Sequence, residues 1–131
     1  MTEQSILSLD SKNMREMLKN FPAQMMEAVN IGRAATLPKK FRTPKNIVVA
    51  GLGGSAIGGD LLRSYLADEL EMPMQICRHY TLPAYVNKDS LVIISSYSGN
   101  TEETIAAHKE ATKRGATVLC ISTNGATEKL A

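Results

Sequence analysis

Residues 46–60 read Asn46-Ile-Val-Val-Ala50 followed by Gly51-Leu-Gly-Gly-Ser-Ala-Ile-Gly-Gly-Asp60, and this stretch decides the fold. Its first part is an almost wholly apolar run, which is typical of a strand buried on both faces. The glycine-rich part predicts a tight turn, and residues 56 to about 67 predict a helix. A buried strand that passes through such a turn into a helix is the repeating unit of an α/β protein.

The same pattern recurs toward the C-terminus. Further strands are predicted at 74–77, 91–94 and 117–121, with helices over 101–114 and from 126 onward. Gly115 follows two basic residues, where a left-handed helix cap is expected. We therefore predict the α/β class, as a three-layer αβα sandwich with a parallel sheet in the flavodoxin-like order 2-1-3-4. The stretch after Arg78 shows no clear helix, so the connection between the second and third strands stays open.

The first 45 residues show a different pattern and are predicted to form N-terminal helices and a connector, ahead of a domain at 46–131. One helix is expected from a cap at Asp10-Ser11 to about Asn20, and a second is expected to begin at Pro22. The segment 38–45 contains two prolines and four positive charges. It is therefore predicted to be a solvated loop.

The composition excludes several classes of protein. Hydrophobic residues make up 44% and charged residues 21% of the 131 residues, as in a globular domain. Aromatic residues make up 5% and the net charge is +2, which disfavours nucleic-acid binding. No apolar stretch is long enough to cross a membrane, and the start lacks the features of a signal peptide. We expect a cytoplasmic protein with neither a nucleic-acid nor a membrane partner.

The two cysteines are not expected to form a metal site. Cys77 and Cys120 each lie in a short apolar run and are predicted to be small buried side chains. A metal would need more ligands than these two and a distant histidine. His108 lies within a predicted helix and is expected to be solvated. No metal is predicted.

The loop after the first strand is predicted to bind an anion. It holds five of the nine glycines, more than a tight turn needs. The free N–H groups of a helix start suit an anionic group. Gly51, Gly53 and Ala56 also satisfy the dinucleotide fingerprint, although Arg78 stands where a ribose-binding acid is wanted. An NADP site therefore stays open as a weaker alternative.

The loop after the third strand places three hydroxyl groups around a turn that opens a helix. Ser96, Ser98 and Thr101 offer donors that suit a tetrahedral phosphate. Asn100 and Glu103 resemble a capping box, which is the competing structural interpretation of this loop. Capping alone needs one hydroxyl rather than three. Because strands one and three are neighbours in the predicted order, both loops are expected to face one crevice.

These two loops together resemble the bifunctional phosphoglucose/phosphomannose isomerases, which belong to the sugar isomerase (SIS) domain superfamily. The second loop reads Ser95-Ser-Tyr-Ser-Gly-Asn-Thr-Glu-Glu103. Arg78 followed by Tyr80-Thr-Leu-Pro-Ala-Tyr-Val86 is similar to a further family segment. In the family the residue after this arginine is often Asp, whereas here it is His79. The resemblance covers about residues 46–125.

The resemblance implies a SIS-type sandwich, two such domains per chain and a homodimer with active sites between domains and subunits. It implies aldose–ketose isomerisation between glucose or mannose 6-phosphate and fructose 6-phosphate, by proton transfer through an enediol to a carboxylate base. No cofactor or metal is implied. The sugar-binding residues carried over from the family are Gly53, Gly54 and Ser55, and the phosphate-binding residues are Ser96, Ser98 and Thr101.

The chain is shorter than the family pattern and is predicted to correspond only to the N-terminal half, truncated after the fourth strand. The base and the ring-opening histidine of the family lie in the missing part, so no catalytic residue is assigned. Asp60, Glu102 and Glu103 are the carboxylates nearest the loops, and none is well placed as a base. We therefore expect that this chain alone does not isomerise sugar phosphates. A non-catalytic SIS module that senses phosphosugars is the main alternative.

Overall fold

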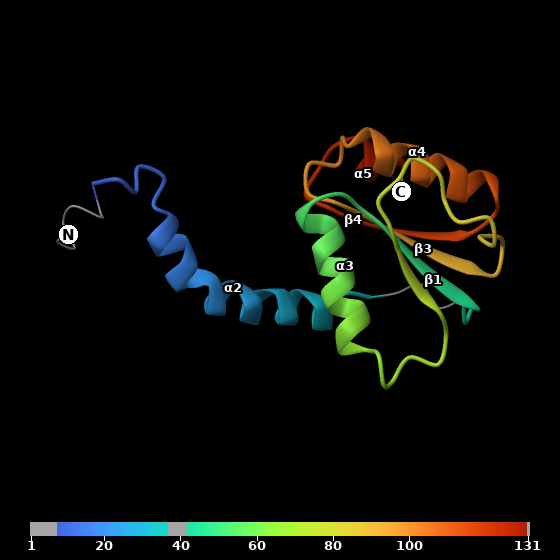
Figure 1. Cartoon of the computed structure of the whole chain (residues 1–131), viewed down its shortest axis with the longest axis horizontal. Helices are drawn as coiled ribbons and strands as arrows, with labels where there is room; N and C mark the ends of the chain where they lie inside the picture. The colour runs from blue at the N-terminus through green and yellow to red at the C-terminus, as the bar shows by residue number, and fades with distance from the viewer. Residues whose placement is uncertain (1–7, 37–41, 131) are drawn as a thin grey trace. The chain divides into compact units, whose positions relative to one another are not determined.

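A four-stranded parallel sheet forms the centre of the domain in the computed structural model, which describes residues 8–36 and 42–130. Its strands are β1 (Asn46–Ala50), β2 (Met74–Cys77), β3 (Ser90–Ser96) and β4 (Thr117–Ser122). They lie in the order β2-β1-β3-β4 (Figure 1). The register pairs Val49 of β1 with Ile76 of β2 and with Ile93 of β3. The predicted order 2-1-3-4 is confirmed.

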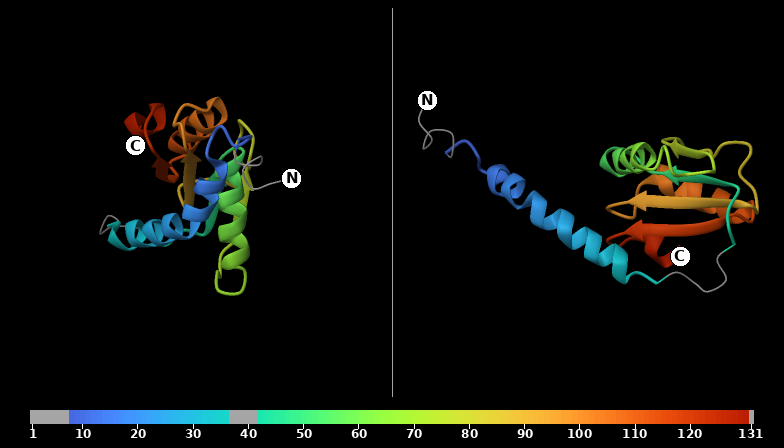
Figure 2. Two further views of the ribbon diagram at one scale, coloured as in Figure 1. Left: turned by 90° about the vertical axis from the view of Figure 1, so that its left-hand side faces the viewer. Right: turned by 90° about the horizontal axis from the view of Figure 1, so that it is seen from below.

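Three helices cover the two faces of this sheet. They are α3 (Gly54–Tyr65), α4 (Glu102–Lys113) and α5 (Ala126–Leu130). From β1 the chain moves through α3 to β2, and from β3 it moves through α4 to β4 in the opposite direction along the sheet. Because such crossovers are right-handed, the two helices lie on opposite faces (Figures 1 and 2). The predicted three-layer sandwich is therefore confirmed.

The core lies between the sheet and α4. Val48, Val92 and Ile94 alternate along their strands and expose none of their surface. Each contributes about 1.5–3 kcal/mol by burial. The small side chains Ala107 and Ala111 allow α4 to pack closely over them.

The connection between β2 and β3 takes the place of a helix on this face. It buries Leu82 and Val86 in the same core cluster. The Leu82 N–H donates to Glu110 Oε2 at 2.7 Å, and the Arg114 guanidinium donates to the Pro83 carbonyl at 2.7 Å. These bonds attach the irregular segment to α4, which explains why it needs no helix of its own.

The N-terminal part forms one helix instead of the two that were predicted. The chain divides into the units Met1–Phe41 and Arg42–Ala131, and α2 (Met14–Ala34) belongs to the first. Pro22 lies inside α2. Proline has a φ compatible with a helix. Its ring removes one backbone hydrogen bond and crowds the preceding turn, but it does not end this helix. The Asp10 carboxylate accepts from the Met14 and Arg15 N–H groups, as a capping side chain does, but the N-cap position is Asn13 rather than the predicted Asp10-Ser11.

Several element boundaries and one burial prediction also differ. Helix α3 begins at Gly54 rather than residue 56, and β3 extends to Ser96. His108 is 5% exposed, so the prediction that it is solvated is wrong. It follows the buried Thr104 by four residues and therefore lies on the inward side of α4.

Other predictions for the domain are confirmed in whole or in part. Cys77 is buried as predicted, whereas Cys120 is only half-buried, and both are free thiols. Gly115 ends α4 with a φ of 72°, and the N–H of Ala116 donates to the Ala111 carbonyl, as in a left-handed helix cap. Part of the predicted connector, residues 38–41, lies outside the described residues.

Candidate functional site

The carboxyl ends of β1 and β3 border a groove of about 550 Å³. Four of the six predicted binding residues contribute to its lining, together with two apolar residues that were not predicted. The lining residues are Leu52, Gly54, Ser55, Tyr97, Ser98 and Thr101. Ligand pockets typically have volumes of about 300–1,000 Å³. The groove is therefore large enough for a small phosphorylated metabolite.

Gly53 sets the geometry of the first loop. Its φ of 56° and ψ of −129° lie where side-chain-bearing residues rarely occur. Its carbonyl accepts hydrogen bonds from the Ala56 and Ile57 N–H groups, each at 3.1 Å, and so starts α3. No side chain caps this helix start. The N–H groups of Gly54 and Ser55 thus remain available to a ligand, within the part of the chain that the structure describes.

The five glycines of this loop have two different roles. A Cβ at Gly51 would lie 3.0 Å from the Ser95 carbonyl oxygen, and one at Gly59 would lie 3.0 Å from the Ile76 Cδ1 atom. Gly51 thus lets the chain after β1 lie close to β3, and Gly59 lets α3 pack closely on β1 and β2. A Cβ at Gly53, Gly54 or Gly58 would meet nothing within 4 Å. Tight packing therefore accounts for only part of the glycine cluster.

The three hydroxyl groups of the second loop lie at different depths below the surface. Ser98 is exposed and Thr101 half-buried, and both line the groove. Ser96 is only 3% exposed and does not line it. Its Oγ accepts from the Gly99 N–H at 3.2 Å and lies 3.3 Å from Thr101 Oγ1. Ser96 thus supports the loop and orients the Thr101 hydroxyl from below.

The competing interpretation of Asn100 and Glu103 as a capping box is wrong. Helix α4 begins at Glu102, so its N-cap is Thr101, which makes no side-chain cap bond. The third helical residue is then Thr104, whose hydroxyl donates to the Thr101 carbonyl at 2.8 Å. The Asn100 side chain instead accepts from the Ala126 N–H at 3.0 Å, at the start of α5. The start of α4 is therefore left open toward the groove.

The loop after β4 supports the loop after β3, which the sequence did not reveal. The Thr123 N–H and hydroxyl both donate to the Tyr97 carbonyl, and the Thr127 N–H donates to the Gly99 carbonyl at 3.0 Å. Sequence reasoning identified 122–125 only as a turn. The glycine at position 125 was the one local signal in the sequence. Its φ of 93° is a backbone conformation that residues with a side chain rarely adopt.

The lining of the groove combines polar and apolar groups and contains no charged side chain. The N-termini of α3 and α4 both end there, and each carries a partial positive charge. Glu102 and Glu103 lie in the first turn of α4 but do not line the groove. The Tyr80 hydroxyl donates to Glu102 at 3.4 Å, and the negative charge of Glu103 is the main cause that raises the pKa of Tyr80.

Asp60 and Arg78 form an ion pair beside the first loop. Asp60 also lies 3.5 Å from the Arg63 guanidinium. Arg78 therefore already has a carboxylate partner, and an NADP 2′-phosphate would have to compete with it. Asp60 does not line the groove either, and no lining residue offers a carboxylate for proton transfer.

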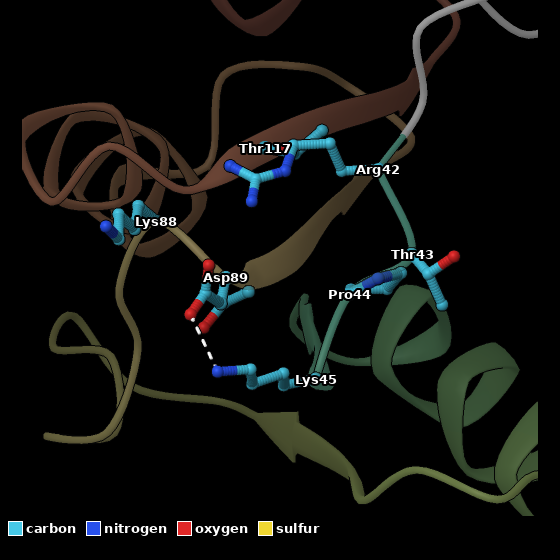
Figure 3. A pocket seen from close by; sticks show the side chains of 8 residues that line it. Arg42, Thr43, Pro44, Lys45, Lys88, Asp89 and Thr117 are labelled. Atoms are coloured by element: carbon cyan, nitrogen blue, oxygen red, sulfur yellow. Dashed lines mark ion pairs between the residues drawn. The ribbon is translucent and has the colours of Figure 1, made fainter.

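A second, much smaller hollow lies at the opposite end of the sheet, where β1, β3 and β4 begin. Figure 3 shows Arg42, Lys45 and Lys88 around Asp89, with Lys45 and Asp89 3.1 Å apart. The hydrogen bond from Lys45 is the main cause that lowers the pKa of Asp89. Its volume of about 90 Å³ is below that of typical ligand pockets. This hollow does not contain the predicted binding residues.

Neither a membrane span nor a metal cluster is found in the part of the chain that the structure describes. None of its helices combines the length and the apolar character that a bilayer crossing requires. Across residues 8–36 and 42–130, His, Cys, Asp and Glu side chains do not gather in groups of three that could hold a metal ion.

Comparison with known proteins shows relatives along most of the chain. The bifunctional phosphoglucose/phosphomannose isomerase of Caldicellulosiruptor bescii is 44% identical over 118 residues, covering 90% of this chain and 35% of that protein. The protein of the same name from Aquifex aeolicus is 45% identical over 82 residues, covering 62% of this chain and 26% of that protein. The chain thus spans about a third or less of the length of these relatives.

A solved structure from Clostridium difficile 630, provisionally named a phosphosugar isomerase, has the same fold. Its TM-score is 0.71 at 21% identity, over 82% of this chain and 32% of that chain. The curated relatives confirm the resemblance that the two loops indicated. The SIS domain family matches residues 40–131, and this chain therefore belongs to the SIS domain family.

Proposed function

We propose that the groove between the two loops binds a sugar 6-phosphate. The observation that carries this proposal is the convergence of Gly54, Ser55, Ser98 and Thr101 on one groove where two helices begin. Hydroxyl and backbone N–H donors suit the oxygen atoms of a phosphate, and the partial positive charge of two helix N-termini adds to their attraction. The family and the names of its relatives support a phosphosugar over other phosphates.

In this proposal, each of the two loops contacts a different part of the ligand. Ser98, Thr101 and the open N–H groups of α4 hold the phosphate. Ser96 acts from beneath by holding Thr101. Gly53, Gly54 and Ser55 face the sugar, where the lack of side chains on the two glycines lets the ligand approach the backbone.

The protein to which this chain belongs is proposed to interconvert glucose or mannose 6-phosphate and fructose 6-phosphate. The relatives from Caldicellulosiruptor bescii and Aquifex aeolicus carry names with this activity. A relative from Sulfolobus acidocaldarius, 32% identical, is named a D-glucosamine-6-phosphate 4-epimerase, so the scaffold also occurs with another reaction on a sugar phosphate. The homodimer, the cytoplasmic location and the absence of a cofactor stay predictions.

A titration tests the proposed ligand class. Fructose 6-phosphate added to the chain should give saturable heat of binding by calorimetry. NADP should bind much more weakly, because Arg78 stands where a ribose-binding acid is wanted and is itself paired with Asp60. Tight NADP binding without a response to the sugar phosphate would contradict the proposal and favour the dinucleotide alternative.

Binding without turnover is expected of this chain by itself. Enediol chemistry needs a base within hydrogen-bond reach of the proton at C2 of the sugar. Asp60 and Glu102 are engaged with Arg78 and Tyr80, and no carboxylate lines the groove. A coupled assay for glucose 6-phosphate should therefore show no turnover above background. Turnover that disappears in Glu102→Gln or Glu103→Gln would show that the base lies within this chain.

A further inference from the structure

Two exposed side chains with apolar surface, Leu52 and Tyr97, border the groove. Tyr97 is 79% exposed and Leu52 is 42% exposed, and both are lining residues. Leu52 comes from the loop after β1 and Tyr97 from the loop after β3. We call this pair the apolar rim. Neither residue was predicted from the sequence to bind a ligand. Leu52 lies between two glycines and Tyr97 between two serines, and the prediction rested on the glycines and serines.

The backbone of Tyr97 is held in place while its ring is free. Its carbonyl accepts two hydrogen bonds from Thr123, and its neighbour Ser96 is buried beneath it. Among the described residues, the Tyr97 hydroxyl has no hydrogen-bond partner. A large aromatic ring on a fixed backbone offers contact area at low cost in conformational entropy. Its placement at the groove therefore favours contact with a ligand over a role in folding.

The chemistry of a sugar phosphate matches this arrangement. The phosphate end is charged and requires the donors of Ser98, Thr101 and the helix starts. The carbon skeleton carries C–H groups that present apolar patches between its hydroxyl groups. Small-molecule pockets typically combine a few polar groups with aromatic and apolar walls in this way. An aromatic face can cover the C–H groups while its hydroxyl reaches a sugar oxygen.

We propose that Tyr97, assisted by Leu52, contacts the carbon skeleton of the bound ligand and selects sugar phosphates over inorganic phosphate. This inference rests on the proposed function, because it assumes that the phosphate lies at the start of α4. Tyr97 is then a specificity-determining residue whose contribution is absent when the ligand has no carbon skeleton.

Paired titrations of the chain with fructose 6-phosphate and with inorganic phosphate test this inference. Tyr97→Ala should weaken fructose 6-phosphate binding by roughly three- to tenfold and leave inorganic phosphate binding unchanged. Tyr97→Phe should retain most of the sugar-phosphate affinity, since the ring is kept. Leu52→Ala should cause a smaller loss of the same kind. Tyr65→Ala is the matched control, because Tyr65 is 81% exposed on α3 and does not line the groove.

The outcomes separate the two proposals. Unchanged fructose 6-phosphate affinity in Tyr97→Ala would overturn the role of the apolar rim and leave the phosphate site intact. Equal losses for both ligands would overturn it as well, because Tyr97 would then act by shaping the loop. If the unaltered chain binds neither ligand, the proposed function fails and this inference fails with it.

Discussion

Gly99 and Asn124 lie so close that a Cβ at Gly99 would stand 1.7 Å from the Asn124 carbonyl oxygen. Gly99 belongs to the loop that carries Ser98 and Thr101, whereas Asn124 belongs to the loop after β4. The φ of Gly99 is 65°, so its conformation also disfavours a side chain. The two loops therefore fit together only because residue 99 has no side chain.

Gly99→Ala should both destabilise the domain and weaken ligand binding. The positive φ and the overlap with Asn124 together should cost about 2–5 kcal/mol of unfolding free energy. The displaced loop should carry Ser98 away from the groove. Thermal unfolding and calorimetry with fructose 6-phosphate measure the two effects. Gly32→Ala is the matched control, because a Cβ there meets nothing within 4 Å. Full stability in Gly99→Ala would contradict the proposed contact.

Gly53 and Gly58 should respond in opposite ways to the same substitution. A Cβ meets nothing within 4 Å at either position, so space does not distinguish them. Gly53 has a φ of 56°, and Gly53→Ala should lower stability by about 1–2 kcal/mol. Gly58 lies inside α3, and Gly58→Ala should raise stability by about 0.5–1 kcal/mol. Urea unfolding of both variants measures the difference. Equal effects would show that backbone conformation is not the cause.

Replacing the two groove hydroxyls should weaken phosphate binding without unfolding the domain. Hydrogen bonds to a charged group are worth about 1.5–3 kcal/mol each. Ser98→Ala combined with Thr101→Val should therefore reduce fructose 6-phosphate affinity at least about tenfold. Calorimetry gives the affinity, and far-ultraviolet circular dichroism checks the fold. Thr117→Val, on an exposed residue at the opposite end of the sheet, is the control. Unchanged affinity would leave the hydroxyls with only a structural role.

His108 should make the domain less stable in mild acid. Burial lowers the pKa of His108, because the charged imidazolium is poorly solvated on the inward side of α4. Its folded pKa lies below its unfolded pKa, so the unfolded chain binds the proton more readily. Stability should therefore be full above the unfolded pKa of about 6.5 and should fall as the pH drops below it.

Melting temperatures at pH 7.5 and pH 5.5 test this linkage. The difference between them should be smaller in His108→Gln than in the unaltered chain. His79→Gln is the control, since His79 is exposed. If the two variants show the same pH dependence as the unaltered chain, the burial of His108 does not control acid stability.

Local patterns were sufficient for much of the fold. The apolar runs at Asn46–Ala50 and Met74–Cys77 match β1 and β2 residue for residue. Continuous apolar strands that alternate with helices also led to the correct strand order. The predicted strand order, with the first and third strands as neighbours, was enough to predict that the two loops share one crevice. Four of the six predicted residues do line one groove.

The tertiary structure alone decided the features that depend on residues far apart in the chain. Asn100 pairs with Ala126, and Thr123 with Tyr97, each across 26 positions, so no local motif revealed them. His108 is buried because α4 turns that side toward the sheet, which helical spacing cannot specify without knowing the partner. The sequence was sufficient to identify the hydroxyl-bearing residues of the second loop that we propose bind phosphate. The tertiary structure decided how deep each of these residues lies: Ser98 lines the groove, whereas Ser96 is buried beneath it. Local sequence could not specify this, because burial depends on neighbours from other strands and loops.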